Sequence, residues 1–176
     1  SRMESQYTRE WERLVNDFLT APLADDVREH GRQTVVDVLA ATVAGSAVPS
    51  IAEVASEANF ADGGASIIGT GRQVAPAQAA LVNTAAAIAQ EIEEGHNTGG
   101  HVGAGIVAGG LPVAETQNVD GETFVDACIR AYEICVRLER AIFAMKDRMN
   151  DAIPWLVRNP HSTWTTVGPA MTSALC

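Results

Sequence analysis

Residues 76–115 read PAQAALVNTAAAIAQEIEEGHNTGGHVGAGIVAGGLPVAE. Pro76 occupies a position typical of the first turn of a helix, and the alanine-dense residues after it predict a helix over 77–94 that Gly95 terminates. So many alanines indicate close packing of this helix against its neighbours. A polar turn with two histidines follows, and a new apolar segment begins after His101.

The rest of the chain also has helical periodicity, and no segment shows a convincing strand pattern. Asp26 and Glu29 resemble an N-terminal cap pair for a long helix that ends at Gly45. Another helix should begin at Asp120, with one apolar face formed by Phe124, Cys128, Ala131, Cys135, Leu138 and Ile142. Residues 46–71 look looser, with a turn at 62–64 and at most a minor extended segment near 65–69. We therefore predict an all-α helical bundle, and a single domain over 1–176, because no linker divides the chain.

Composition excludes several classes of function. The 176 residues are 47% hydrophobic, which suffices for a sizeable core, and 22 acidic against 12 basic residues give a net charge of −10. Nucleic-acid binding is disfavoured because a negative surface repels phosphate. No signal peptide and no charge-free run of 18 apolar residues is present, so we expect no membrane association and a cytoplasmic location. Cys128 and Cys135 are interpreted as core residues.

The carboxylates at the end of the alanine-rich segment are the first candidates for chemistry. On a continuous helix, Glu91 and Glu94 would share one face and Glu93 would point elsewhere. Neighbouring negative charges and burial raise a carboxyl pKa, so one of these groups could serve as a general acid or base. The alternative is an exposed acidic helix end, although acidic residues there oppose the helix dipole.

The histidines are the second set of candidates. If the segment after His101 is helical, its first N–H groups, at Gly103 and Ala104, would bind a substrate carboxylate beside the imidazole. His161, within RNPHSTWTTVG, could close the same pocket. Each of these histidines could instead be a capping or surface residue. A metal site built from Glu93, His96 and His101 fits no recognised ligand spacing, so we expect no metal and no cofactor.

Five segments together resemble the N-terminal part of the MmgE/PrpD family, which includes 2-methylcitrate dehydratase, cis-aconitate decarboxylase and iminodisuccinate epimerase. They are DVLAATVAG at 37–45, ASIIGTGRQVAPAQAALVNTAAA at 65–87, EIEEGHNTGGHVGAG at 91–105, AYEICVRLERA at 131–141 and the segment around His161. The resemblance implies a helical domain paired with a smaller α+β domain, a homodimer, and metal-independent proton transfer next to a carboxylate of a small di- or tricarboxylate.

The same resemblance suggests roles for individual residues. Glu91 falls where the family commonly places an active-site aspartate, Glu93 and Glu94 fall on the acidic pair after it, and His101 and His161 match the family's two histidines. Glu91, His101 and His161 are therefore the predicted catalytic residues, and Glu93, Glu94, Gly103 and Ala104 the predicted substrate-binding residues. Gly95 replaces a threonine of the decarboxylase branch, so a 2-methylcitrate dehydratase-like reaction is favoured over decarboxylation.

Family members are considerably longer, and this chain stops at Cys176 within an apolar run. We expect a truncated portion of a larger enzyme that lacks the family's catalytic lysines and has little or no turnover alone. A separately encoded remainder of the enzyme is one predicted partner. The alternative is a non-catalytic helical module that pairs with such a partner or with itself. Exposed apolar faces on the helices that contain Ala77 and Phe124 would favour self-association.

Overall fold

The computed structural model describes residues 2–97 and 100–152, and the side chains of 6–97 and 100–141. The helices are α1 (Arg2–Thr20), α2 (Asp25–Ser46), α3 (Pro49–Glu57), α4 (Pro76–Ile88), α5 (Gly109–Gln117) and α6 (Gly121–Ala152), with a π-helical segment η1 (Ala104–Ala108). Two short antiparallel strands, β1 (Asp62–Ser66) and β2 (Gln73–Val74), form the sheet. The predicted all-α class with a minor extended segment is confirmed.

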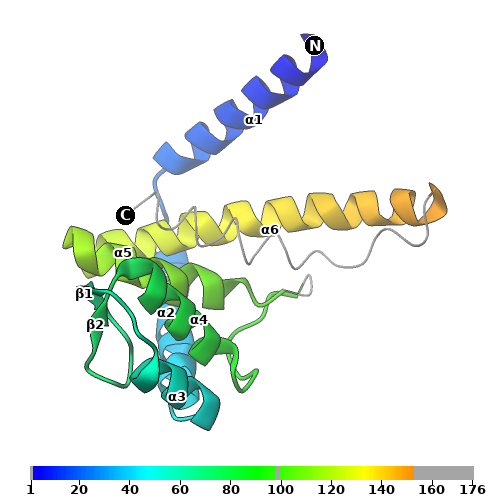
Figure 1. Ribbon diagram of the computed structural model, residues 1–176. Coiled ribbons are helices and arrows are strands. Elements are labelled where there is room, and N and C mark those ends of the chain that lie inside the picture. The colour runs from blue at the N-terminus through cyan, green and yellow to red at the C-terminus, as the bar shows by residue number, and fades with distance from the viewer. Residues whose placement is uncertain (1, 98–99, 153–176) are drawn as a thin grey trace.

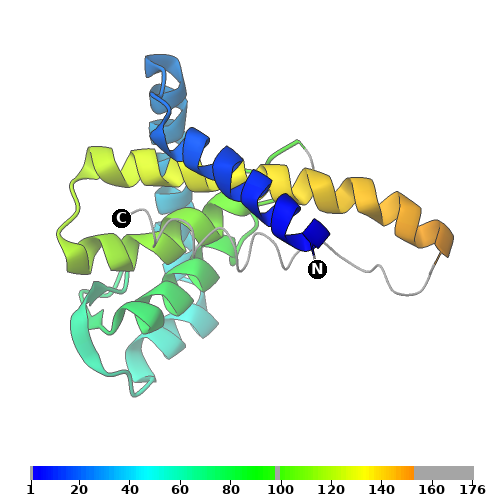
Figure 2. The ribbon, with the colours of Figure 1, turned by 90° about the horizontal axis from the view of Figure 1, so that it is seen from above.

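The long helix α6 runs along one side of the molecule, and the remaining helices except α1 pack below it in the view of Figure 1. One apolar core joins α2, η1, α5 and α6, and a second joins α3, the two strands and α4. Helix α1 projects away from this body, and among the described elements it contacts only α6 (Figures 1 and 2). The site discussed below lies in the body, beside α6.

Helices α2 and α4 pack closely, as the alanine content of α4 predicts. A Cβ atom on Gly45 of α2 would overlap the backbone carbonyl oxygen of Ala86 on α4. Glycine at position 45 therefore lets the two backbones touch. The outer faces of the same helices expose apolar side chains at Val36, Val43, Leu81 and Ile88.

The predicted helix over 77–94 is shorter than expected. Helix α4 ends at Ile88, and residues 89–95 form turns and irregular backbone. Glu91 has a φ of 50°, a left-handed conformation that cannot continue a right-handed helix. The prediction that Glu91 and Glu94 share a helix face is therefore wrong, and tertiary contacts decide where each carboxylate points.

Helical backbone resumes at Val102 and continues through η1 and α5 to Gln117. The wider π-helical turn of η1 precedes Pro112, whose ring nitrogen cannot donate a hydrogen bond to the preceding turn. Asn118, with a φ of 54°, closes the helix in the left-handed conformation. The predicted helix after His101 is confirmed, and His101 lies immediately before its first turn.

Helix α6 begins where the sequence indicates, because the Asp120 carboxylate accepts the backbone N–H of Thr123 at 2.9 Å. Its buried face includes Phe124, Cys128 and Cys135, so the interpretation of these two cysteines as core residues is confirmed. Phe124, Cys128, Ala131 and Cys135 are all 6% exposed or less, so over the described side chains of α6 the apolar face is buried and the expectation that it is exposed is wrong.

Three local predictions also need correction. Residues 62–64, predicted as a turn, lie in β1, and Pro49 begins a helix within the segment predicted to be loose. The cap position of α2 is Ala24, which makes no side-chain cap hydrogen bond.

Among the described helices, none alone has the length and apolar composition of a membrane span. Helices α2 and α3 meet that test only as a pair, and this pair is bent by 83° at the break between them.

Candidate active site

Glu94 is the residue through which the loop after α4 is attached to the rest of the molecule. Its backbone N–H donates to a carboxylate oxygen of Asp37 on α2 at 2.8 Å. Its Oε1 accepts the backbone N–H of Gly103 at 2.6 Å, and its Oε2 accepts the hydroxyl of Tyr132 on α6 at 2.6 Å. One loop residue is thus bound to three separate elements.

The bond to Gly103 depends on glycine. A Cβ atom at position 103 would overlap Oε1 of Glu94, so any larger residue would displace the carboxylate. Gly103 lies in the first turn of the helix that begins at Val102, where backbone N–H groups have no partner within the helix. The Glu94 carboxylate therefore occupies the anion position that we predicted for a substrate at Gly103 and Ala104.

His101 is oriented by the same loop. Its Nδ1 lies 3.0 Å from the backbone carbonyl oxygen of Glu94 and 3.5 Å from Oε1 of Glu93. A carbonyl oxygen can only accept, so the hydrogen bond requires a proton on Nδ1. In the neutral ring the lone pair is then on Nε2. The side chain is 52% exposed, so the ring is accessible to solvent.

Glu93 is the buried member of the acidic cluster, with a side chain only 3% exposed. Its Oε1 faces His101, and its Oε2 is buried without a hydrogen-bond partner among the described residues. A buried carboxylate with an unsatisfied oxygen is costly unless a positive charge or a proton is close. The Nδ1–H group of His101, 3.5 Å from Oε1, is the polar group that the structure places against this buried carboxylate.

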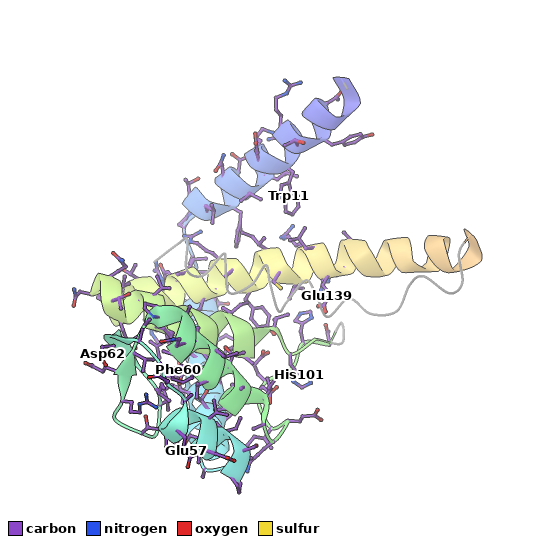
Figure 3. The ribbon with its side chains drawn as sticks, viewed as in Figure 1. Trp11, Glu57, Phe60, Asp62, His101 and Glu139 are labelled. Atoms are coloured by element: carbon purple, nitrogen blue, oxygen red, sulfur yellow. The ribbon has the colours of Figure 1, made fainter. Side chains whose placement is uncertain are left out.

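Tyr132 forms the α6 side of the site. Burial, and then the hydrogen bond to the Glu94 carboxylate, raise the pKa of Tyr132 above its ordinary value. Its ring packs edge to face with the ring of His96, with centroids 6.0 Å apart. Seven residues further along α6, Glu139 is completely buried, and its charge also raises the pKa of Tyr132. Figure 3 labels Glu139 on α6 and His101 in the loop below it.

A pocket of about 920 Å³ lies on the α2 and α6 side of this loop. Its walls include Glu94, His96 and Tyr132, together with apolar residues of α2 and α6, but not His101. Among the described residues that line it, none is a lysine or an arginine. The pocket therefore supplies little positive charge for a carboxylate ligand.

The structure brings four of the predicted site residues together and separates others. His101 contacts Glu93 and Glu94, and Glu94 in turn accepts a hydrogen bond from Gly103, whereas the side chain of Glu91 is exposed. Ala104 is 1% exposed and lies in the core. His161 lies outside the described residues, so its predicted role stays untested.

The sequence interpretation missed Asp37, Tyr132 and Glu139. Asp37 and Tyr132 contact Glu94 from different helices, and no local pattern links them to it. Tyr132 and Glu139 are seven residues apart on one helix, a spacing that places both on the same face. The sequence signal that could have identified Glu139 was its position as a charged residue on the apolar face of α6. Among the described residues, no group of three or more His, Cys, Asp or Glu side chains could hold a metal ion.

Fold and site together define a helical domain with a histidine–carboxylate site at a loop between packed helices. The sequence model of the MmgE/PrpD N-terminal domain matches residues 12–175, which is nearly the whole chain. The chain therefore belongs to the MmgE/PrpD family and corresponds to its N-terminal domain. No curated protein and no solved structure gives a significant match.

Proposed function

We propose that this chain supplies the proton-transfer part of an MmgE/PrpD-type active site, in a lyase or isomerase that acts on small di- or tricarboxylates. A 2-methylcitrate dehydratase-like reaction is the form that we favour. His101 moves the proton at the carbon next to a substrate carboxylate, and Glu93 is the buried charge behind it. No metal takes part in the proposed step.

The observation that carries this proposal is the placement of the two acceptors at Nδ1 of His101. They direct the ring proton to Nδ1 and leave the Nε2 lone pair for a substrate proton. When Nε2 takes that proton, the ring becomes positively charged 3.5 Å from the Glu93 carboxylate. Glu93 is buried but the His101 ring is half exposed, so solvent screens this attraction in part, and the remaining attraction stabilises the protonated ring as it forms.

The proposal changes the roles within the acidic cluster. Glu91 is the catalytic residue that the family resemblance suggests, but its side chain is exposed, and the acidic residues at His101 are Glu93 and Glu94. Glu93, predicted only to bind substrate, lies against the imidazole. We therefore assign the electrostatic role to Glu93 and the positioning of the loop to Glu94.

The negative charge of the proposed substrate, compared with the charge of the pocket lining, supports a further component of the enzyme. A dicarboxylate or tricarboxylate needs positive groups around it, and the described part of the pocket lining contains neither lysine nor arginine. We propose that these groups come from the remainder of the enzyme, on the same polypeptide or encoded separately. A homodimer is the proposed assembly.

The test is the incorporation of solvent deuterium into 2-methylcitrate, followed by NMR, with the chain in the assembly that completes its site. His101→Gln keeps a polar side chain but removes the base, and should lower the exchange rate by a factor of about 100 or more. Glu93→Gln should lower it substantially, whereas Glu91→Gln, the same change two residues away, should leave it nearly unaltered. Exchange that survives His101→Gln, or that depends on Glu91 rather than Glu93, would contradict the proposal.

A further inference from the structure

We propose that Tyr132 is a positioning residue for His101: by holding the Glu94 carboxylate, it fixes the backbone carbonyl that keeps the imidazole proton on Nδ1. The importance of this role for turnover rests on the proposed function of His101. The geometry itself can be tested without turnover.

The connection consists of two short hydrogen bonds through one residue. The Tyr132 hydroxyl donates to Oε2 of Glu94 at 2.6 Å, and the carbonyl oxygen of the same glutamate faces Nδ1 of His101 at 3.0 Å. A shift of the Glu94 backbone therefore moves the acceptor that selects the tautomer. Tyr132 does not need to touch the ring of His101 to control it.

Glu94 requires such external anchors because its backbone is not part of a helix. It lies after the end of α4, in a segment without regular structure. Its three anchors are Asp37 at the N–H, Gly103 at Oε1 and Tyr132 at Oε2. Without the tyrosine hydroxyl, Oε2 would lose its donor in a half-buried position, and the carboxylate would turn toward water.

Tyr132 is suited to this role because α6 holds it rigidly. The neighbouring residues Ala131 and Cys135 are completely buried in the main core. Burial and the adjacent Glu94 carboxylate also raise the pKa of Tyr132, so its hydroxyl stays protonated and remains a donor throughout the range in which histidine titrates. The anchor therefore persists whether His101 is neutral or charged.

The experiment measures the tautomer of His101 by NMR on protein with ¹³C,¹⁵N-labelled histidine, at a pH where the ring is neutral. The His101 signals are assigned with His101→Gln. In the wild type we expect the Nδ1–H form to dominate, and in Tyr132→Phe we expect it to become the minority. Tyr7→Phe is the matched control, because Tyr7 is the other tyrosine of the chain and is 70% exposed on α1. It should leave the His101 signals unchanged.

Two further variants keep the inference falsifiable if Tyr132→Phe does not fold. Glu94→Ala removes the carboxylate without touching α6, and should shift the tautomer in the same way. Glu94→Gln should preserve it, because the tyrosine hydroxyl can accept from the amide while the amide oxygen accepts from Gly103. An unchanged tautomer in Tyr132→Phe or in Glu94→Ala would overturn the inference, as would an equal shift in Tyr7→Phe.

Activity provides a second and separate readout. In the complete assembly, Tyr132→Phe should lower kcat about tenfold or more with little change in KM, because the variant misplaces the base without altering substrate contacts. If the tautomer shifts as expected but the wild-type assembly exchanges no substrate proton, the proposed function fails and the positioning role stands. An altered KM with an unchanged tautomer would instead indicate a role for Tyr132 in substrate binding.

Discussion

Replacing Gly45 with alanine tests whether the contact between α2 and α4 holds the body of the protein together. The added Cβ would overlap the carbonyl oxygen of Ala86, which belongs to the backbone of α4 and cannot rotate away. The helices must separate, and overpacking of this kind costs about 1–3 kcal/mol. We take the upper end because the displaced atom is backbone. Alanine regains up to about 1 kcal/mol of helix propensity, which leaves a net loss of about 2 kcal/mol.

The assay is thermal unfolding followed by circular dichroism. For a domain of this size, a loss of about 2 kcal/mol corresponds to a Tm about 4–8 °C lower. Gly121→Ala is the matched control: Gly121 is the first residue of α6, and a Cβ there meets nothing within 4 Å. The control should leave the Tm unchanged or raise it slightly. A Gly45→Ala protein as stable as the wild type would refute the close packing of α2 against α4.

Three more predictions concern other contacts. Arg72 donates hydrogen bonds to three carbonyl groups at the end of α3, so Arg72→Ala should lower the free energy of unfolding, measured in urea, by about 2 kcal/mol. Arg32→Ala is the control: it breaks an exposed ion pair and should lower the free energy of unfolding by less than about 1 kcal/mol. Equal losses in the two variants would contradict the capping role of Arg72. The hydrogen bond from Arg28 holds the pKa of Asp126 below its ordinary value, so the pair stabilises the folded state at pH values above the unfolded pKa, and this stabilisation is lost as acid protonates the carboxylate. In Asp126→Asn the free energy of unfolding should therefore fall less steeply below about pH 4 than in the wild type. The same pH dependence in variant and wild type would show that the pair does not cause this fall. The exposed apolar face of α4 should drive self-association, so Leu81→Glu should lower the mass measured by sedimentation at micromolar concentration. A wild-type protein that is monomeric at this concentration would contradict the prediction of self-association.

The main helices could be predicted from the sequence because their signals are local. The apolar period of α6, the capping carboxylate of Asp120 and the first-turn proline of α4 each act within a few residues of the structure they specify. Close packing of α4 followed from its alanines for the same reason, since small side chains allow close approach whatever the partner is. Helix α3 was missed because its nine residues carry too short a pattern.

The site depended on contacts that no local pattern contains. The sequence predicted that α4 continues as far as Gly95. The one sequence signal for an earlier end was the group of acidic residues, which oppose the helix dipole at a C-terminus. In the folded chain α4 ends at Ile88, and Asp37 and Tyr132, which lie on other helices, bind Glu94 in the loop that follows.

Composition and periodicity thus determined the helical class, the main helices and the segment that contains the candidate site. Which glutamate is buried against His101, and which nitrogen of that ring carries the proton, was decided only by tertiary structure. The physical reason is that a carboxylate's burial and a histidine's tautomer depend on the groups around them. Here the tautomer of His101 depends on the position of Glu94, and Glu94 is held by Asp37 and Tyr132, which are far apart in the sequence.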